Sequence, residues 1–292
     1  MLAANKWKDY ELIDTGNGEK LERWGKYILR RPDPQVIWPF TDKDGLWAKA
    51  DAHYHRSSSG GGRWEYARKL PDRWIVTYEK LKFYVEPTGF KHTGLFPEQA
   101  VNWDWIIDRI KSAGSPVRVL NLFAYTGGAT IAAAFGGAEV CHVDAAKGMV
   151  SRAKENLELS GLGDRTVRFI TDDVVKFVQR EIRRGRKYEA VIMDPPSYGR
   201  GPKGEMWKIE DELYGLIELC MGVLSESPVF FLINSYTTGL APSVLKNLLC
   251  LTVAKRFGGH ASSDEVGIPV SGTGIILPCG ASGRWEAAVK KN

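Results

Sequence analysis

The sequence predicts an α/β protein with a parallel sheet in its second part and a small antiparallel β-rich domain before it. From about residue 117 onward, short apolar runs alternate with amphipathic stretches, a pattern that is typical of βα units. Before about residue 100, short aromatic and β-branched runs such as 74–78 are separated by turn residues. We therefore expect a β-rich domain over 1–100 and an α/β domain over 101–292.

Five apolar runs in the second part predict buried strands. Each run is short, apolar and bounded by polar or turn residues, as expected of parallel strands that are covered on both faces. They span 117–123, 139–144, 166–171, 188–193 and 229–234. Two further segments, 275–277 and 284–289, predict an antiparallel hairpin at the edge of the sheet.

Apolar residues at helical spacing between these strands predict the covering helices. The helix after the first strand is expected to end at Gly136-Gly137 and the next at Ser160-Gly161, because glycine favours the left-handed cap of a helix. The predicted helices span 129–135, 146–157, 174–182, 210–224 and 243–257. This alternation of strand and helix is the basis of the α/β prediction.

Composition and charge exclude several classes of protein. With 43% hydrophobic and 26% charged residues, the 292-residue chain can bury a core and is not expected to be disordered. The four cysteines form no C-x-x-C pair, which argues against a disulfide framework and a zinc ribbon, and we expect no metal. No stretch approaches the roughly 18 apolar residues of a membrane helix. We expect a cytoplasmic protein whose net charge of +5 permits an anionic partner.

A glycine turn after the first strand of the α/β part favours nucleotide binding. Gly127 and Gly128 precede a helix, and the N-terminal amides of a helix can face a ligand. The turn lacks the G-x-G-x-x-G spacing that cradles a pyrophosphate, so a dehydrogenase is not favoured. Asp144 ends the next strand at about the ~20-residue spacing expected of a carboxylate that binds ribose hydroxyls. These features predict a site for an adenosine without phosphates.

Polar turns also follow the third and fourth strands. Asp172 and Asp173 end the third strand, where a carboxylate can accept a hydrogen bond from the adenine amino group. The fourth strand stops at Asp194-Pro-Pro196, and two consecutive prolines fix φ and remove two donors. Such a rigid turn suits a planar amine or base at the mouth of the cofactor crevice.

Five ordered motifs carry a family resemblance. They are Asn121-Leu-Phe-Ala-Tyr-Thr-Gly-Gly128, Val143-Asp144, Ala153-Lys-Glu-Asn156, Asp172-Asp-Val174 and Asp194-Pro-Pro-Ser197. Together they resemble the class I S-adenosylmethionine-dependent methyltransferases, and more narrowly the bacterial large-subunit rRNA methyltransferases that make 5-methylcytosine or 7-methylguanine. The segment from Lys91 to Gln99 is similar to that group's motif before the catalytic domain. The resemblance implies a Rossmann-like, seven-stranded methyltransferase domain.

The resemblance also implies which residues bind S-adenosylmethionine. Gly127 and the neighbouring backbone would contact the methionine moiety, Asp144 the ribose, and Asp173 the adenine. Phe96 and Gln99 would line the site. The full implied set is Phe96, Gln99, Asn121, Phe123, Tyr125, Thr126, Gly127, Gly128, Asp144, Asp173 and Asp194.

The chain departs from the resembled group at one chemically important position. The 5-methylcytosine members carry a Ser-Cys-Ser segment after the fifth strand, whereas this chain has Asn234-Ser-Tyr-Thr-Thr238. Attack at cytosine C5 needs a thiolate that adds covalently at C6, but the lone pair of a nitrogen can attack a methyl group directly. We therefore expect N-methylation, in which Asp194 and the backbone of Pro195 orient the acceptor and Tyr198 stacks on it.

The substrate is expected to be RNA, with rRNA favoured by the resemblance, but two observations keep alternatives open. The small RNA-binding domain that often precedes this architecture has no evident counterpart, and the basic cluster over 180–187 can be either a phosphate contact or a solvated helix face. One alternative is a methyltransferase for a small molecule or a protein. Another is a non-catalytic S-adenosylmethionine-binding module that interacts with RNA. Cys279, in a turn-like setting, is the one thiol with a candidate catalytic part.

Overall fold

The computed structural model describes residues 1–39, 45–57, 61–89, 91–200 and 206–288, and it divides into two compact units. The α/β unit comprises Met1, Asn102–Glu265 and Gly280–Asn292, and the β-rich unit comprises Leu2–Val101 and Val266–Cys279. The sequence placed residues 266–279 in the α/β domain. They belong instead to the β-rich unit, because the ends of two late strands extend into it.

A mixed, mainly parallel sheet forms the centre of the α/β unit. Its strand order is β1-β16-β17-β15-β12-β9-β10-β11. The strands are β1 (Leu2–Ala3), β9 (Arg118–Leu122), β10 (Glu139–Asp144), β11 (Val167–Thr171), β12 (Ala190–Met193), β15 (Phe230–Ser235), β16 (His260–Pro269) and β17 (Ile276–Glu286). Within this order, β15, β12, β9, β10 and β11 pair in parallel, and β17 pairs antiparallel with β15. The predicted α/β fold is confirmed, with the two-residue β1 as an eighth strand.

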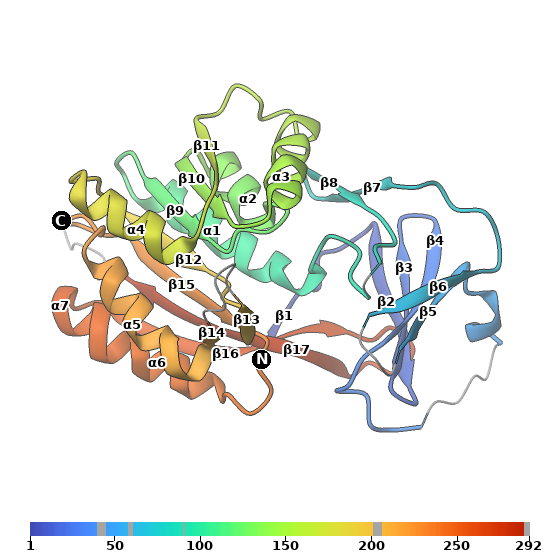
Figure 1. The fold of residues 1–292 in the computed structure, drawn as a ribbon. Helices are drawn as coiled ribbons and strands as arrows, with labels where there is room; N and C mark the ends of the chain where they lie inside the picture. The colour runs from blue at the N-terminus through green and yellow to red at the C-terminus, as the bar shows by residue number, and fades with distance from the viewer. Residues whose placement is uncertain (40–44, 58–60, 90, 201–205, 289–292) are drawn as a thin grey trace. The chain divides into compact units, whose positions relative to one another are not determined.

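Helices cover both faces of this sheet (Figure 1). They are α1 (Ala100–Ser112), α2 (Gly128–Gly136), α3 (Lys147–Leu159), α4 (Val174–Arg183), α5 (Ile209–Met221), α6 (Pro242–Leu249) and α7 (Lys255–Phe257), with the π-helical turn η3 (Cys250–Ala254) joining the last two. Helices α1 to α3 lie on one face, and α4 to α7 lie on the other. The carboxyl ends of the parallel strands lie together at one edge of the sheet, which we call the open edge, and the turns that carry the predicted site begin there.

The apolar core explains why the spacing of apolar residues predicted the strands and helices of the α/β unit. All four residues of β12 and all six of β15 are buried, as expected for strands covered on both faces. The α4 residues at helical spacing, Val174, Phe177 and Val178, are buried in the same cluster. Observed strand and helix ends therefore fall within a few residues of the predicted ones.

The β-rich unit contains a five-stranded sheet and a hairpin. The sheet order is β2-β3-β4-β5-β6, and β7 pairs antiparallel with β8. The strands are β2 (Tyr10–Gly16), β3 (Glu19–Trp24), β4 (Tyr27–Pro32), β5 (Ala52–Arg56), β6 (Gly62–Tyr66), β7 (Trp74–Tyr78) and β8 (Leu81–Val85), and two 3-10 turns are η1 (Trp47–Lys49) and η2 (Pro97–Gln99). The predicted antiparallel, β-rich character is confirmed, although β4 and β5 pair in parallel.

Three elements differ from the sequence expectation. Helix α1 was not predicted, although its buried Trp103, Ile106 and Ile110 follow helical spacing. The terminal hairpin was placed wrongly, because 276–277 and 284–286 both lie in β17, which lies between β16 and β15 in the sheet. A short hairpin of β13 (Tyr198–Arg200) and β14 (Met206–Lys208) also follows the Asp-Pro-Pro turn.

Candidate cofactor and acceptor site

The turn after β9, which we call the cofactor turn (Phe123–Gly127), has an unusual backbone. Phe123, Tyr125 and Gly127 have φ angles of 54°, 49° and 88°. Positive φ is uncommon in residues other than glycine, and backbone of this kind concentrates at ligand sites. The turn is closed by hydrogen bonds from Ala124 N to Val143 O at 3.1 Å and from Gly127 N to Ala124 O at 3.0 Å.

Packing requires Gly127, the last residue of the turn, and Gly128, the first residue of α2. A Cβ at Gly127 would lie 2.9 Å from the Cβ of Ala153 in α3, and one at Gly128 would lie 2.8 Å from Cζ2 of Trp103 in α1. Asn156 of α3 also donates its amide to the carbonyl of Thr126 at 3.0 Å. Two helices therefore fix the cofactor turn against the sheet, and Thr126 contributes through its backbone.

Asp144 connects the end of β10 to the cofactor turn. Its carboxylate accepts from the backbone N–H of Tyr125 at 2.9 Å and from that of Ala146 at 2.8 Å. Each carboxylate oxygen can accept more than one hydrogen bond. Asp144 can therefore hold the turn and still accept from the hydroxyls of a ligand at the sheet edge.

The two acidic residues after β11 have different partners. Asp173 is the N-cap of α4, where its Oδ1 accepts from the backbone N–H of Lys176 at 2.9 Å. Asp172 forms an ion pair with Arg180 and accepts from the N–H of Asp173. The backbone N–H of Asp172 also donates to Asp144 O at 3.1 Å, which places both acidic turns side by side at one edge.

The segment after β12, which we call the acceptor loop (Asp194–Tyr198), begins at the same edge. Its backbone is tied to the cofactor turn's strand by a hydrogen bond from Asp194 N to Leu122 O at 3.3 Å. Asp194 is half-buried, Pro195 is buried, and Tyr198 is 49% exposed. The side chain of Tyr198 is therefore accessible from solvent, as stacking on a substrate ring requires.

Three of the proposed cofactor residues stand apart from this edge or belong to the other unit. Asn121 lies inside β9 and is buried, and its amide donates to Thr130 Oγ1 at 2.9 Å, so it packs inside the unit rather than facing a ligand. Thr130 in turn contacts His142 Nδ1 at 2.9 Å, and burial lowers the pKa of His142 to about 3. Phe96 and Gln99 lie at and beside η2 in the β-rich unit.

None of the cysteines in the described part of the α/β unit has the properties of a nucleophile at this edge. Cys141 is buried within β10, and burial raises the pKa of its thiol to about 11. Cys220 is fully buried in α5, and its pKa is also raised by burial. Cys250 is exposed in η3, within the helical connection from β15 to β16 and not in a turn of the open edge.

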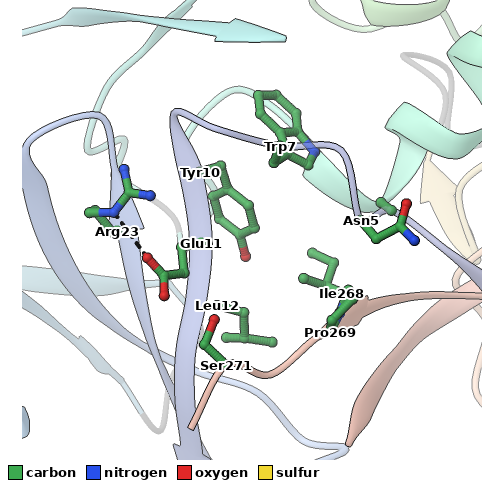
Figure 2. Close-up of a pocket in the computed structure, with 10 residues that line it drawn as sticks. Asn5, Trp7, Tyr10, Glu11, Leu12, Arg23, Ile268, Pro269 and Ser271 are labelled. Carbon is green, nitrogen blue, oxygen red and sulfur yellow. Dashed lines mark hydrogen bonds and ion pairs between the residues drawn. The ribbon is translucent and has the colours of Figure 1, made fainter. Parts of the chain in front are cut away.

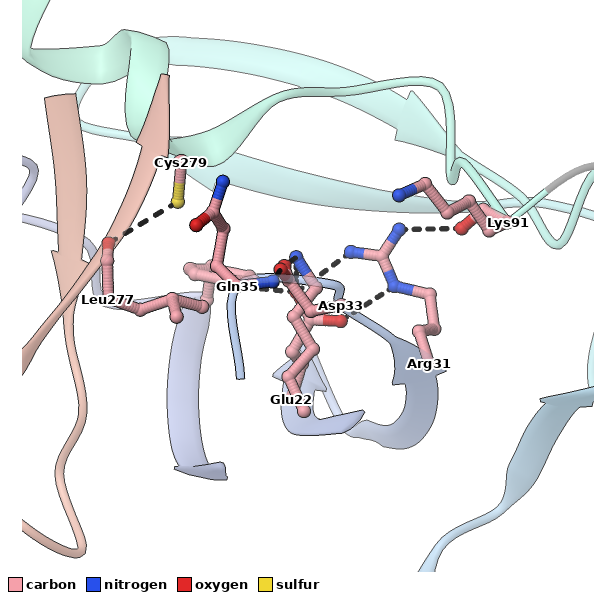
Figure 3. A network of polar contacts seen from close by, with 9 residues as sticks. Glu22, Arg31, Asp33, Gln35, Lys91, Leu277 and Cys279 are labelled. Atoms are coloured by element: carbon pink, nitrogen blue, oxygen red, sulfur yellow. Dashed lines mark hydrogen bonds and ion pairs between the residues drawn. The ribbon is translucent and has the colours of Figure 1, made fainter. Parts of the chain in front are cut away.

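Cys279 belongs to the β-rich unit and lies beside a group of charged residues (Figure 3). Its Sγ is 3.5 Å from the carbonyl of Leu277. Burial first, and then the carboxylate of Glu98, raise the pKa of the Cys279 thiol well above its ordinary value. The thiol is therefore protonated at neutral pH, which argues against the catalytic part considered for it.

Three members of the basic cluster in and after α4 have partners in the structure. Arg180 pairs with Asp172, Arg184 with Glu181 at 3.2 Å, and Lys187 donates to the carbonyl of Gly222 at 2.9 Å. Helix α4 begins at the open edge, so its last turn lies toward the opposite edge. Arg180, Arg184 and Lys187 therefore have structural contacts, whereas Arg183 and Arg186 are exposed.

A cavity of about 270 Å³ occurs in the β-rich unit, outside the predicted site (Figure 2). Its lining includes Trp7, Tyr10 and the ion pair between Arg23 and Glu11, whose atoms are 3.2 Å apart. Across the described ranges there is no cluster of three or more His, Cys, Asp or Glu that could hold a metal ion. The same part of the chain has no helix long and apolar enough to cross a bilayer.

Curated relatives cover part of the chain. It is 28% identical over 175 residues to ribosomal RNA large subunit methyltransferase K of Neisseria meningitidis, which is 59% of this chain and 48% of that protein. It is 35% identical over 152 residues to ribosomal RNA large subunit methyltransferase K/L of Shewanella frigidimarina, which is 50% of this chain and 20% of that protein. The chain thus spans about half or less of the length of these relatives.

Solved structures match nearly the whole chain. A SAM-dependent methyltransferase from Agrobacterium tumefaciens superposes with a TM-score of 0.90 at 37% identity, covering 97% of this chain and 91% of that one. The protein SMU.776, solved complexed with SAH, superposes with a TM-score of 0.74 at 18% identity, covering 96% and 76%, which shows the fold alone. The family model for S-adenosylmethionine-dependent methyltransferases matches residues 46–219, more than half of the chain. With its glycine turn and the acidic ends of its neighbouring strands, the chain belongs to the S-adenosylmethionine-dependent methyltransferase family.

Proposed function

We propose that this protein transfers a methyl group from S-adenosylmethionine to a nitrogen of a nucleobase in RNA, with ribosomal RNA as the substrate class. The observation that carries the proposal is the arrangement at the open edge of the sheet. The acceptor loop and the cofactor turn follow neighbouring strands there, and Asp194 N is bonded to the strand that leads into the cofactor turn. A cofactor and an acceptor bound to these two segments are next to each other.

The residues at this edge fit S-adenosylmethionine. The positive φ angles of the cofactor turn give a strained backbone of the kind found at ligand sites, and the two glycines let it lie close against α1 and α3. Asp144 can accept from ribose hydroxyls, and Asp173, exposed at the start of α4, can accept from the adenine amino group. Phe123, Tyr125, Thr126, Gly127 and Gly128 would hold the rest of the molecule.

The acceptor loop supplies orientation. Two consecutive prolines hold the backbone carbonyl of Pro195 and the carboxylate of Asp194 in a fixed relation, and both can accept hydrogen bonds from a planar amine. Tyr198 can stack on the ring that carries the amine, a contact worth roughly 1–3 kcal/mol per base. When bound, S-adenosylmethionine supplies an electrophilic methyl group. Catalysis by this chain then consists mainly of positioning and exclusion of water.

The cysteines support nitrogen rather than carbon as the acceptor. Methylation of cytosine C5 needs a thiolate that adds to C6. At the two positions where a cysteine would serve this edge, the chain has Ser197 in the acceptor loop and the segment that begins at Asn234, near the end of β15. Asn234 is buried, and its Oδ1 accepts from Asn102 at 3.1 Å and Ser282 at 2.7 Å, so it braces the sheet.

RNA is proposed because the curated relatives are named for ribosomal RNA methylation, although the chain matches only part of each. A cytoplasmic location belongs to the same proposal. The direct test incubates the purified protein with methyl-labelled S-adenosylmethionine and separate pools of RNA, proteins and small metabolites, and digests labelled RNA for nucleoside mass spectrometry. We expect label on a base nitrogen. Label on cytosine C5, or only in another pool, contradicts the proposal, and cofactor binding without transfer to any pool indicates a non-catalytic module.

A further inference from the structure

We propose that Trp207 is a positioning residue that joins the acceptor loop to the cofactor turn, so that the two halves of the site keep one relative placement. This inference rests on the proposed function and concerns the same site. Trp207 lies in β14, in the short hairpin that follows the acceptor loop. It is half-buried and packs against the main apolar core of the α/β unit.

The first contact of Trp207 is with the acceptor loop. Its indole Nε1 donates a hydrogen bond to the backbone carbonyl of Pro196 at 2.6 Å. Proline offers no backbone N–H, so the Asp-Pro-Pro segment has fewer hydrogen bonds of its own with which to hold its position. A side chain that binds the Pro196 carbonyl fixes the peptide plane between Pro196 and Ser197. This plane directly follows the one that carries the Pro195 carbonyl, which is proposed to face the acceptor.

The second contact of Trp207 is with the cofactor turn. Its ring centroid lies 5.7 Å from that of Phe123, at an interplanar angle of 51°. This distance is within the range in which aromatic pairs attract one another. Phe123 is the first residue of the cofactor turn and has a positive φ, so its side chain direction is coupled to the strained backbone that follows. One indole thus contacts both segments through different parts of its ring.

Further hydrogen bonds hold the β13–β14 hairpin and the acceptor loop, and they fix the position of Trp207. Tyr198 pairs with Lys208 and Gly199 pairs with Trp207 in the β13–β14 register. The backbone N–H of Ile209 donates to Ser197 O at 3.2 Å, and Thr237 donates its hydroxyl to Ser197 Oγ at 2.7 Å. The loop is therefore braced from β14, from the start of α5 and from the segment after β15.

This arrangement separates two effects that substitution can distinguish. Trp207→Phe keeps an aromatic ring near Phe123 but removes the N–H that binds Pro196. Trp207→Ala removes both contacts. The chain also offers a matched control, because Trp285 donates its indole N–H to the carbonyl of Gly258 at 2.7 Å and lies near the ring of Phe257. Trp285 is in β17 at the level of Phe231, within the sheet, and takes no part in the proposed site.

The experiment measures four quantities for the wild type, Trp207→Phe, Trp207→Ala and Trp285→Phe. They are the dissociation constant of S-adenosylmethionine by calorimetry, kcat and KM on the RNA that the labelling experiment identifies, and deuterium uptake of the amides of 197–199. We expect Trp207→Phe to lower kcat about three- to tenfold, as for the loss of one hydrogen bond, with little change in cofactor affinity. Trp207→Ala should in addition weaken cofactor binding roughly two- to tenfold.

Both Trp207 variants should speed deuterium uptake at 197–199, whereas Trp285→Phe should lower thermal stability and leave all four quantities near the wild type. The inference is overturned if Trp207→Phe matches the wild type in kcat and deuterium uptake, or if Trp207→Ala binds S-adenosylmethionine as tightly as the wild type. If the wild type methylates no RNA, the proposed function fails, but calorimetry and deuterium uptake still decide whether Trp207 joins the two segments.

Discussion

Substitution of Gly127 by alanine tests the cofactor turn most directly. Gly127 has a φ of 88°, and a Cβ there would lie 2.9 Å from the Cβ of Ala153. The left-handed backbone costs an alanine about 1–2 kcal/mol, and overpacking against a helix adds about 1–3 kcal/mol. We therefore expect Gly127→Ala to lower the free energy of unfolding by about 2–5 kcal/mol and to displace the turn.

Gly137 provides a control at the other end of the same helix. Its φ is 103°, but nothing lies within 4 Å of a Cβ built on it. Gly137→Ala should therefore cost only the backbone part, about 1–2 kcal/mol, because the collision is absent. Any gain from a less flexible unfolded chain is the same for both variants and cancels in the comparison.

Urea unfolding and calorimetry with S-adenosylmethionine measure the two consequences. Gly127→Ala should be the less stable variant and should bind the cofactor at least tenfold more weakly than the wild type, whereas Gly137→Ala should bind it normally. Equal destabilisation of the two variants would show that the contact with Ala153 relaxes without cost. Normal cofactor binding by folded Gly127→Ala would refute the assignment of this turn to the cofactor.

Three further predictions concern the carboxylates and the substrate. Asp144→Ala leaves two backbone N–H groups without their acceptor and should weaken S-adenosylmethionine binding roughly ten- to a hundredfold in calorimetry, and an unchanged affinity would exclude the ribose role. Asp194→Ala should abolish transfer in the labelling assay while cofactor affinity stays within a few fold, and comparable turnover by the variant would disprove the acceptor role. Binding of an RNA substrate should weaken steeply as salt rises, because phosphate contacts release counterions, whereas a small-molecule enzyme should respond little to salt in the same titration.

The pH dependence of stability should report a buried carboxylate in the β-rich unit. Burial alone would raise the pKa of Glu22, but Arg31 and Lys20 outweigh it and lower the pKa to about 2. Because the folded-state pKa lies below the unfolded value, Glu22 stabilises the fold fully above about pH 5, and this contribution is lost as the pH falls toward 2. Glu22→Gln should unfold more easily at neutral pH, by about 3–5 kcal/mol, and lose less stability on acidification. An unchanged acid profile in urea titrations would count against this pairing.

The sequence was most informative where strands and helices are buried on a regular period. The runs at 117–123, 139–144 and 229–234 became β9, β10 and β15 because buried parallel strands must be continuously apolar. Strand β16 was missed because its first half is polar and partly exposed, and only Ala261 is buried among its first six residues. The residues of β16 are continuously buried only from Val266 to Ile268, where the chain enters the β-rich unit. No local sequence pattern predicts that change.

The positions of the candidate site residues could be predicted where they follow from the order of strands and helices alone. Asp144, Asp173 and Asp194 lie at or just after the carboxyl ends of β10, β11 and β12, which are parallel strands of one sheet, so the alternation of elements was enough to bring them to one edge. Trp207 could not be predicted in this way, because its place depends on the register of a three-residue hairpin in a stretch rich in glycine and lysine. Asn121 lies inside a motif, but its side chain faces α2, where its amide donates to Thr130.

The glycines of the cofactor turn show why the motif resembles a nucleotide fingerprint without matching it. In the dinucleotide fingerprint, glycine spacing lets the backbone approach a pyrophosphate. Here a side chain at either position would collide with the protein itself, at Gly127 with Ala153 and at Gly128 with Trp103. A turn pressed against two helices can place its strained carbonyls and amides at the sheet edge without any phosphate to bind. The adjacent pair of glycines is therefore a consequence of packing, and it favours a cofactor recognised through ribose, base and methionine rather than through phosphate.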